Sequence, residues 1–437
     1  MDPTTEFSDL DEEIVKKIFS FLSLKEVTAI ERVSTTCGRV SQNMWTSVKV
    51  IPKNESLYGH HYTSMVLKCP SLKVFDASRA LTESDLMKDD DETSIGIKLA
   101  ASCPSIRVFK GLGILGVILV STYVQSLGKN CSITEIELHP GTNREMYTVS
   151  ELKNRYVDSM RQIVRKGSNV RKVTIIASFD WASLLCQTSQ LDGEESRSVL
   201  EVLGSGTTSL RTNYDMIYRQ MICSGHQLQE LNVEFNLSES FITCLGRNHP
   251  NLVTLRINCP KSKESFQSLH SLHSLKKLEF RQITMGSISD YVSVFRDFLV
   301  ARGSQLVLLS LINVYVDFTG IWTLIGQKCP ELRRFQVNRY WFDQSNQNEI
   351  FDTIIMLRKL KRLELQDFFH RRGFTKDQVN QILNLKPLLK YIKYCPKTMN
   401  LDATKKAVKL FLNEVQLYQT QPEFKGRRPI TVITSQF

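Results

Sequence analysis

The apolar positions of this chain recur in one arrangement, apolar-x-x-apolar-x-apolar, which each time follows a break. The clear copies are LKCPSLKVFDAS (67–78), ASCPSIRVFKGL (101–112), KNCSITEIELHP (129–140), RNHPNLVTLRIN (247–258), QKCPELRRFQVN (327–338) and IMLRKLKRLELQ (355–366). Weaker copies start at residues 167, 225, 272 and 303. Their first apolar positions are Leu72, Ile106, Ile133, Val170, Leu228, Leu252, Leu275, Leu306, Leu332 and Leu360, mostly 23 to 37 residues apart. Such a period indicates a repeat protein, and the longer interval after Val170 is predicted to hold a degenerate unit around Leu210.

Each unit predicts a helix, a stop and a short strand. In ELRRFQVN, Leu332, Phe335 and Val337 are predicted to point into the core. Gln336 and Asn338 then point to the opposite face, because successive strand side chains alternate. The preceding segment, GIWTLIGQKC, gathers its apolar residues on one helical face, and the proline that follows it ends the helix.

A single unit of this kind cannot bury its own apolar face, so neighbouring units must stack. Stacking aligns the strands in one parallel sheet with the helices on its other side. The predicted fold is therefore an α/β solenoid of the leucine-rich-repeat horseshoe type. Ten copies with the break on the same side favour it over an ordinary α/β domain whose strands happen to look alike.

The two ends of the chain depart from the repeat. Residues 402–418 predict an amphipathic helix that caps the last repeat, with Ala407, Leu410, Phe411 and Val415 on one side. The expected organisation is an N-terminal helical module over 7–50, an array of about 11–13 irregular repeats over 60–400, and a C-terminal cap and tail over 401–437.

Residues 7–45 predict three short helices. Two pairs have the spacing of capping boxes: Asp9 with Glu12, and Ser23 with Glu26. A bundle of roughly 40 residues lies at the lower limit for an independent core. This one holds more apolar side chains than it can bury, notably Phe19, Phe21 and Trp45. Some of them are expected to cover the first repeat or a partner.

The charge balance suits acidic partners. The chain has a formal net charge of +11, but its 56 lysines and arginines are interleaved with 45 acidic residues. Such mixing is typical of a solvated surface, and a nucleic-acid groove is not expected.

The ten cysteines include no CxxC pair, and five stand directly before proline: Cys69, Cys103, Cys259, Cys329 and Cys395. Regular placement of this kind indicates small apolar residues in a repeated slot, rather than disulfides or a metal site. No secretory signal or membrane span is recognised, so the protein is expected to be cytoplasmic and/or nuclear.

The N-terminal module resembles an F-box. The matching residues are Leu10 to Ile14 (LDEEI), Ile18 to Ser23 (IFSFLS), Glu31 to Ser34 (ERVS) and the closing pair Met44-Trp45. Asp11 replaces the usual proline, and Cys37 replaces the usual internal tryptophan. These departures are expected to weaken the start of the first helix and to remove an apolar anchor, which would loosen docking. With the repeats, the module resembles F-box/leucine-rich-repeat proteins.

This resemblance implies a substrate-recognition subunit of a Skp–cullin–F-box (SCF-type) ubiquitin ligase. The module would bind a Skp-type adaptor, and through it a cullin–RING ligase, while the repeats hold a target for proteasomal degradation. No catalytic residue, metal or cofactor is expected. By position, the adaptor-binding residues would be Leu10, Ile14, Ile18, Phe19 and Leu22, supported by Val27, Val33 and Trp45. All eight also fit the plain core of a small bundle.

The target is expected to bind on the inner face of the sheet. Candidate contacts at strand positions that point away from the core are Arg256, Glu279, Arg281, Gln336, Asn338, Glu364 and Gln366. Each is equally compatible with an ordinary solvated position.

Two alternatives follow from the same sequence. The chain could be a repeat scaffold without a ubiquitin role, its N-terminal helices merely capping the array. More remotely, GLGILG at 111–116, with Glu137 after the next strand-like segment, resembles a dinucleotide fingerprint and would indicate an NAD-dependent enzyme. The histidine pairs His60-His61 and His270/His273 lack a third ligand at useful spacing.

Overall fold

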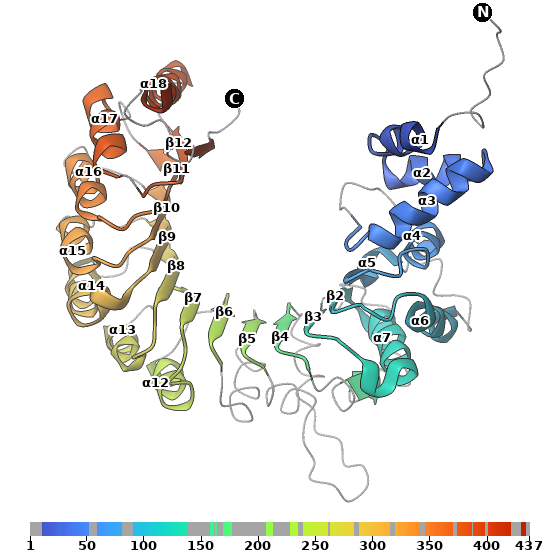
Figure 1. Ribbon diagram of the computed structural model, residues 1–437. Helices are drawn as coiled ribbons and strands as arrows, with labels where there is room; N and C mark the ends of the chain where they lie inside the picture. The colour runs from blue at the N-terminus through green and yellow to red at the C-terminus, as the bar shows by residue number, and fades with distance from the viewer. Residues whose placement is uncertain are drawn as a thin grey trace, which may run out of the picture. The chain divides into compact units, whose positions relative to one another are not determined.

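The computed structural model describes residues 11–51, 59–80, 91–138, 158–160, 162–163, 169–176, 207–212, 228–234, 239–260, 263–283, 288–314, 320–340, 346–369, 374–386, 388–397, 401–420 and 430–433 (Figure 1). The chain divides into two compact units, Met1–Gly225 and His226–Phe437. The first begins with helices and continues with parallel strands, and the second alternates strands with helices throughout its described part. This arrangement confirms the predicted α/β solenoid.

Three short helices open the first unit: α1 (Glu12–Phe19), α2 (Leu24–Ile30) and α3 (Thr35–Ser47). Each starts at a side-chain cap, which satisfies backbone N–H groups that have no partner inside the helix. Ser23 and Glu26 form the predicted capping box at α2. At α3, the Ser34 hydroxyl accepts a hydrogen bond from the Cys37 N–H at 3.1 Å.

The start of α1 differs from the prediction. Asp11, not Asp9, is the N-cap, and its carboxylate accepts a hydrogen bond from the Glu13 N–H at 3.0 Å. Asp9 and Leu10 lie outside the described residues. The expectation that Asp11 weakens this helix is therefore wrong, because a carboxylate at the N-cap pairs with a free N–H and lies at the positive end of the helix dipole.

The three helices share a small core. It is formed by the fully or almost fully buried side chains of Val15, Phe19, Val27, Cys37, Val40 and Trp45. Two side chains of the predicted surplus, Phe19 and Trp45, are thus covered within the chain itself.

The repeats of the first unit follow the module. Their helices are α4 (Gly59–Val66), α5 (Ala77–Ala80), α6 (Asp91–Ser102), α7 (Ile114–Leu127) and the 3-10 turn η3 (Gly128–Asn130). Their strands are β1 (Val74–Asp76), β2 (Val108–Leu112), β3 (Glu135–Leu138), β4 (Lys172–Ile175) and β5 (Ser209–Thr212). The strands pair in parallel, and the register aligns buried Phe75, Phe109, Ile136, Val173 and Leu210 in one row. The degenerate unit predicted around Leu210 corresponds to β5.

The second unit has eight strands in its described part: β6 (Glu230–Val233), β7 (Thr254–Asn258), β8 (Lys277–Ile283), β9 (Leu308–Val314), β10 (Arg334–Tyr340), β11 (Arg362–Phe369), β12 (Tyr391–Lys397) and β13 (Thr431–Ile433). The connecting helices are α12 (Glu239–Asn248), α13 (Lys263–Gln267), η5 (Ser268–Ser271), α14 (Ile288–Arg302), η6 (Gly303–Gln305), α15 (Ile321–Lys328), α16 (Asn346–Met356), α17 (Lys376–Leu385) and α18 (Leu401–Thr420). In this unit the helices lie on one side of the strands (Figure 1). We call the other side the open face.

The core of the second unit lies between the sheet and its helices. One row of buried residues runs in register through Leu231, Leu255, Leu278, Leu309, Phe335, Leu363 and Ile392. Burying each such side chain contributes about 1.5–3 kcal/mol, so stacking of repeats supplies the stability that one repeat lacks.

The end of the array continues further than the sequence pattern indicated. Strands β12 and β13 were not among the predicted copies, yet β12 pairs in parallel with β11, and β13 with β12. The terminal helix α18 buries three residues of its predicted face, Ala407, Phe411 and Val415, while the fourth, Leu410, is half-buried. A strand follows the helix.

The cysteine–proline pairs occupy more than one position. Cys69, Cys103 and Cys329 follow helices α4, α6 and α15, as the prediction of a common slot requires. Cys259 instead follows strand β7, and Cys395 lies within β12. All five are buried free thiols. Burial raises the pKa of Cys69, Cys103, Cys259 and Cys329 to about 12, which keeps these thiols protonated and poorly reactive.

Among the described residues, no helix has the length and apolar content needed to cross a membrane.

Candidate functional site

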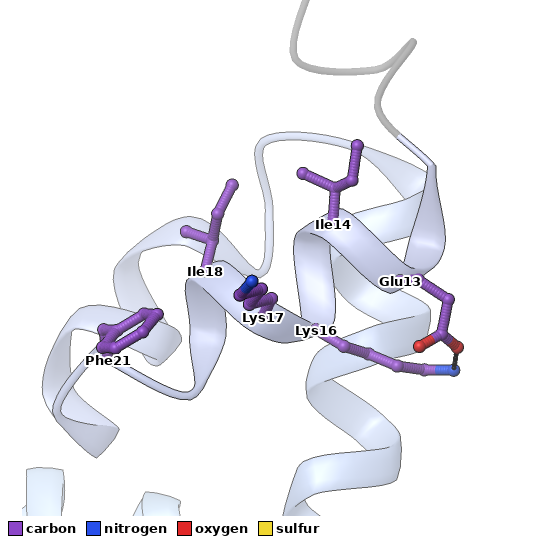
Figure 2. Close-up of a pocket in the computed structure, with 6 residues that line it drawn as sticks. All are labelled: Glu13, Ile14, Lys16, Lys17, Ile18 and Phe21. Atoms are coloured by element: carbon purple, nitrogen blue, oxygen red, sulfur yellow. Dashed lines mark hydrogen bonds and ion pairs between the residues drawn. The ribbon is translucent and has the colours of Figure 1, made fainter.

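An apolar patch lies on the outer side of helix α1. A shallow groove there is lined by Glu13, Ile14, Lys16, Lys17, Ile18 and Phe21 (Figure 2). Ile14 is 50% exposed and Phe21 is 80% exposed, while Ile18 is half-buried. We call Ile14, Ile18 and Phe21 the α1 patch. Large apolar side chains grouped on a surface in this way are typical of interaction sites.

Helical geometry explains how one short helix serves both the core and the patch. Val15 and Phe19, four residues apart, lie on the inner side of α1 and are fully buried. Ile14 and Ile18 have the same spacing but lie one position earlier, so they point to the neighbouring, outer side. Phe21 comes after the helix end, where the chain turns towards α2, and its ring stays in solvent.

Charged residues share the groove with the patch: Glu13, Lys16 and Lys17 line it beside the apolar side chains. The Lys16 ammonium pairs with Glu13 at 2.8 Å and with Glu12 at 3.2 Å. Hydrogen bonding to Glu13 and Glu12 raises the Lys16 pKa, so this cation stays charged at neutral pH. Glu12 also pairs with Arg39 of α3 at 2.9 Å, which connects the first and third helices at the surface. The groove thus combines apolar and charged side chains.

The structure divides the other predicted adaptor-binding residues between core and surface. Phe19, Val27 and Trp45 belong to the core, so any contribution from them to a partner surface is indirect. Val33 is 61% exposed, and Leu22 is half-buried.

Phe21 is absent from the predicted binding residues, although it is the most exposed large apolar side chain among the described residues of the module. The sequence did single it out as part of the apolar surplus. Its position beyond the end of the helical pattern could have indicated that it does not join the core.

The junction with the first repeat is fixed by side-chain and backbone contacts. The Trp45 indole N–H donates to Glu31 at 3.2 Å, Glu31 pairs with Lys68, and the Lys68 ammonium lies 5.7 Å from the Trp45 ring centroid. The Lys73 N–H donates to the Lys49 carbonyl at 2.8 Å. Val50 forms a parallel bridge with Val74 of β1. The chain that leaves the module thus joins the edge of the repeat sheet directly.

The open face of the second unit is polar and rich in ion pairs. Glu279 pairs with Arg281 at 2.8 Å and with Arg256 at 3.8 Å, and Arg281 also lies 3.7 Å from Glu234. The structure therefore brings together three of the predicted target-binding residues on β7 and β8.

The other four predicted target-binding residues lie on β10 and β11. Gln336 is opposite Glu364 in the register, and Asn338 is opposite Gln366. Glu364 is only 5% exposed, because two arginines cover it. We correct its assignment as a direct contact: its carboxylate positions its neighbours. The remaining three are half-buried.

The arginines that cover Glu364, Arg334 and Arg362, are absent from the predicted list. Strand alternation could have identified them, because Arg334 and Arg362 each stand two positions before a residue predicted to lie on the same face, Gln336 and Glu364.

Gly111, the first glycine of GLGILG, has a packing explanation. Gly111 at the end of β2 has a φ of +63°, a conformation that favours glycine, and a Cβ there would lie 2.6 Å from Ser78 Cβ and 3.0 Å from Asp76 Oδ1. The backbone therefore packs closely on the preceding repeat. Gly113 is the N-cap of α7 and offers no side-chain hydrogen bond.

Among the described residues, no group of three or more potential metal ligands occurs. Burial and the nearby Arg302 lower the His270 pKa. Arg302 donates to the His270 carbonyl at 3.1 Å through Nε, which ties η5 to the end of α14.

The fold is a repeat solenoid with an N-terminal helical module. A family description of the F-box domain matches residues 7–47. This module is therefore an F-box domain, and the protein combines it with a solenoid of the leucine-rich-repeat type.

Comparison with whole proteins adds little beyond the fold. No curated protein matches the chain. Among solved structures, it is similar to a chain of the yeast Rad7 and Elc1 complex, with 14% identity over 87% of each chain and a TM-score of 0.49. It is also similar to LegL7, a leucine-rich-repeat-containing protein from Legionella pneumophila, with 12% identity over 78% of this chain and 98% of that chain and a TM-score of 0.41. Both scores are below 0.5, so neither likeness carries a functional inference.

Proposed function

We propose that the protein is the substrate-recognition subunit of an SCF-type ubiquitin ligase. Its F-box would bind a Skp-type adaptor, and its repeats would bind the target. The observation that carries this proposal is the α1 patch: Ile14 and Phe21 remain 50% and 80% exposed, although neighbouring Val15 and Phe19 are fully buried. Covering these side chains with a partner would recover the free energy of burial that the chain itself leaves unused.

The proposed mechanism is proximity. Such a subunit needs no catalytic residue, because holding a target next to a ubiquitin-charged enzyme raises its effective concentration. A flexible link between the two binding sites would dilute this effect. The contacts of Trp45, Glu31 and Lys68, with the bridge from Val50 to Val74, support a stiff connection between the module and the first repeat.

Three further expectations belong to this proposal. The division into an adaptor-binding module (7–50), a repeat array (60–400) and a cap (401–437) follows from it. The target would lie on the open face, near Arg256, Glu279 and Arg281 and beside Gln336, Asn338 and Gln366. A cytoplasmic and/or nuclear location stays a prediction.

The proposal is tested by co-purification of a Skp-type adaptor with the full chain. Replacing Ile14 and Ile18 by glutamate should abolish co-purification, because two charges would have to be buried at the contact. Ile97 on α6 provides a matched control: it is also an exposed helical isoleucine, at 52%, so Ile97→Glu should leave the adaptor bound. Unchanged thermal melting of both variants would exclude unfolding as the cause.

The main alternative is a repeat scaffold whose N-terminal helices only cap the array. It gains the advantage if the unmodified chain never retains a Skp-type adaptor, or if the Ile14/Ile18 variant retains it as well as the Ile97 control.

A further inference from the structure

We propose that the open face over strands β10 to β12 binds an anionic, extended segment of the target, held by Arg334, Arg362 and Lys393. This inference rests on the proposed function, since it specifies the chemistry of the target that the repeats would recognise. It is drawn from the register of the three strands, the ion pairs among their side chains and the distribution of charge over the open face.

The register sets the three cations close together. Arg334 is aligned with Arg362, and Arg362 with Tyr391. In the next row of residues on the open face, Glu364 is aligned with Lys393. Neighbouring strands are ~4.8 Å apart, and alternate residues along a strand are ~6.6 Å apart. The three cationic side chains thus arise from one small area of the sheet.

Two of the cations are held in place by a buried carboxylate. Glu364 Oε1 forms an ion pair with Arg334 Nη2 at 2.8 Å and accepts a hydrogen bond from Arg362 Nε at 2.5 Å. The Arg362 guanidinium also lies 3.8 Å from the Tyr391 ring centroid, a distance typical of stacking. Because Arg362 contacts Glu364 through Nε, its two Nη nitrogens remain for other acceptors. Side chains fixed before binding lose little conformational entropy when a ligand arrives.

One carboxylate cannot neutralise three cations. We count the charges on the open face of β9 to β13 among the residues whose side chains the structure describes. The cations there are Arg334, Arg362 and Lys393, and the one acid is Glu364. Lys393 donates a hydrogen bond to the Gln366 amide oxygen at 2.6 Å. Because this amide is neutral, the contact does not neutralise the Lys393 charge. The area therefore carries an excess of positive charge, and both arginines are partly exposed.

The neighbouring half of the face is balanced instead. The open face over β6 to β8 carries three cations, Arg256, Lys277 and Arg281. It also carries three acids, Glu230, Glu234 and Glu279. This contrast argues for a local anion site rather than a general consequence of the net charge. It also disfavours a nucleic acid, whose continuous phosphate backbone requires a longer basic track without interspersed acids. A short stretch of carboxylates or phosphates on a protein fits the size of the cluster.

The test is fluorescence anisotropy on the purified full chain with short labelled peptides. The probes are a peptide in which glutamate alternates with serine, the same peptide with glutamine in place of glutamate, and a version carrying phosphoserine in a neutral background. We expect at least one anionic peptide to bind about tenfold or more tightly than the glutamine peptide, since charge-assisted contacts are the stronger ones. Comparing the two anionic peptides distinguishes carboxylate from phosphate as the source of charge.

Variants locate the binding. Arg362→Ala should weaken the anionic peptide about tenfold or more. Lys393→Ala should weaken it as well, and this variant leaves both ion pairs of Glu364 intact, so a folding defect is not expected. Lys277→Ala, which removes a cation from the balanced half, is the control and should change affinity by less than about twofold.

The inference is overturned if neither anionic peptide binds better than the glutamine peptide, or if Lys277→Ala weakens binding as much as Arg362→Ala. Tighter binding of a single-stranded RNA, equally reduced by Lys277→Ala, would instead indicate a nucleic-acid face and also overturn it. Adaptor co-purification, measured on the same variants, reports separately on the proposed function. If the unmodified chain retained no Skp-type adaptor, the proposed function would be refuted, while the peptide result would be unaffected.

Discussion

Phe19 and Phe21 allow a sharp test of how the F-box distributes its apolar side chains. The two residues have the same side chain and are two positions apart, yet Phe19 is 0% exposed and Phe21 is 80% exposed. We compare Phe19→Ala with Phe21→Ala. The first empties a site in a small core, and the second removes a ring that is mostly in water.

The burial of each ring sets the expected magnitudes. Replacing a buried phenylalanine by alanine costs about 3–5 kcal/mol, which in a module of this size is enough to unfold it. Phe21 has only a fifth of its surface to lose, so Phe21→Ala should cost less than about 1 kcal/mol. Phe21 should matter for adaptor binding instead of stability. Covering its ring with the adaptor would contribute ~2 kcal/mol, so Phe21→Ala should weaken binding about 30-fold without unfolding the module.

Thermal melting followed by circular dichroism measures the first effect, and biolayer interferometry against a purified Skp-type adaptor measures the second. Phe19→Ala should lower the melting temperature and lose binding together. Phe21→Ala should lose binding alone. The division of the module into core and α1 patch would be refuted if Phe21→Ala destabilised the chain as much as Phe19→Ala.

Two further predictions concern the repeats. Gly111→Ala should destabilise the chain by about 1–3 kcal/mol, because the new Cβ would lie 2.6 Å from Ser78 Cβ. Gly128→Ala, also at a positive φ but with no atom within 4 Å of its Cβ, should cost less in the same denaturant titration; equal costs would contradict the packing argument. Lys386, whose ammonium donates to the Ile355 carbonyl at 2.5 Å, has its pKa lowered to about 8 by burial. The unfolded chain therefore binds the extra proton between pH 8 and 10.5, and stability should rise over this window, by on the order of 3 kcal/mol, relative to Lys386→Met. A stability difference between the two proteins that stays constant with pH would argue against this.

The repeats could be predicted because their signal is periodic. In the structure, as the sequence indicated, Phe335 and Val337 are buried in the core, while Gln336 between them lies on the open face and is half-buried. The missed strands had weaker local signals. β12 contains Cys395-Pro396, a pair that follows a helix at Cys69, Cys103 and Cys329 but here lies in a strand. β13 is only three residues long, too short for a periodic pattern.

The candidate site was harder to predict because it depends on which of two apolar faces turns inward. Helical spacing groups Val15 with Phe19 and Ile14 with Ile18 equally well, and only packing against α3 decides that the first pair is the core. The role of Glu364 required the register of β10 and β11, since the sequence separates it from Arg334 by one whole repeat.

The two proposed binding surfaces differ in chemistry for a physical reason. The α1 patch is apolar, and burial of apolar surface is non-directional and little affected by salt, which suits a partner that is always the same. The cluster on β10 to β12 is charged, and charged contacts discriminate between partners because a mismatched charge is costly. The stacked sheet places Arg334, Glu364 and Lys393 on adjacent strands at fixed spacing. Under the proposed function, the charged cluster on the solenoid would supply the specificity for a target.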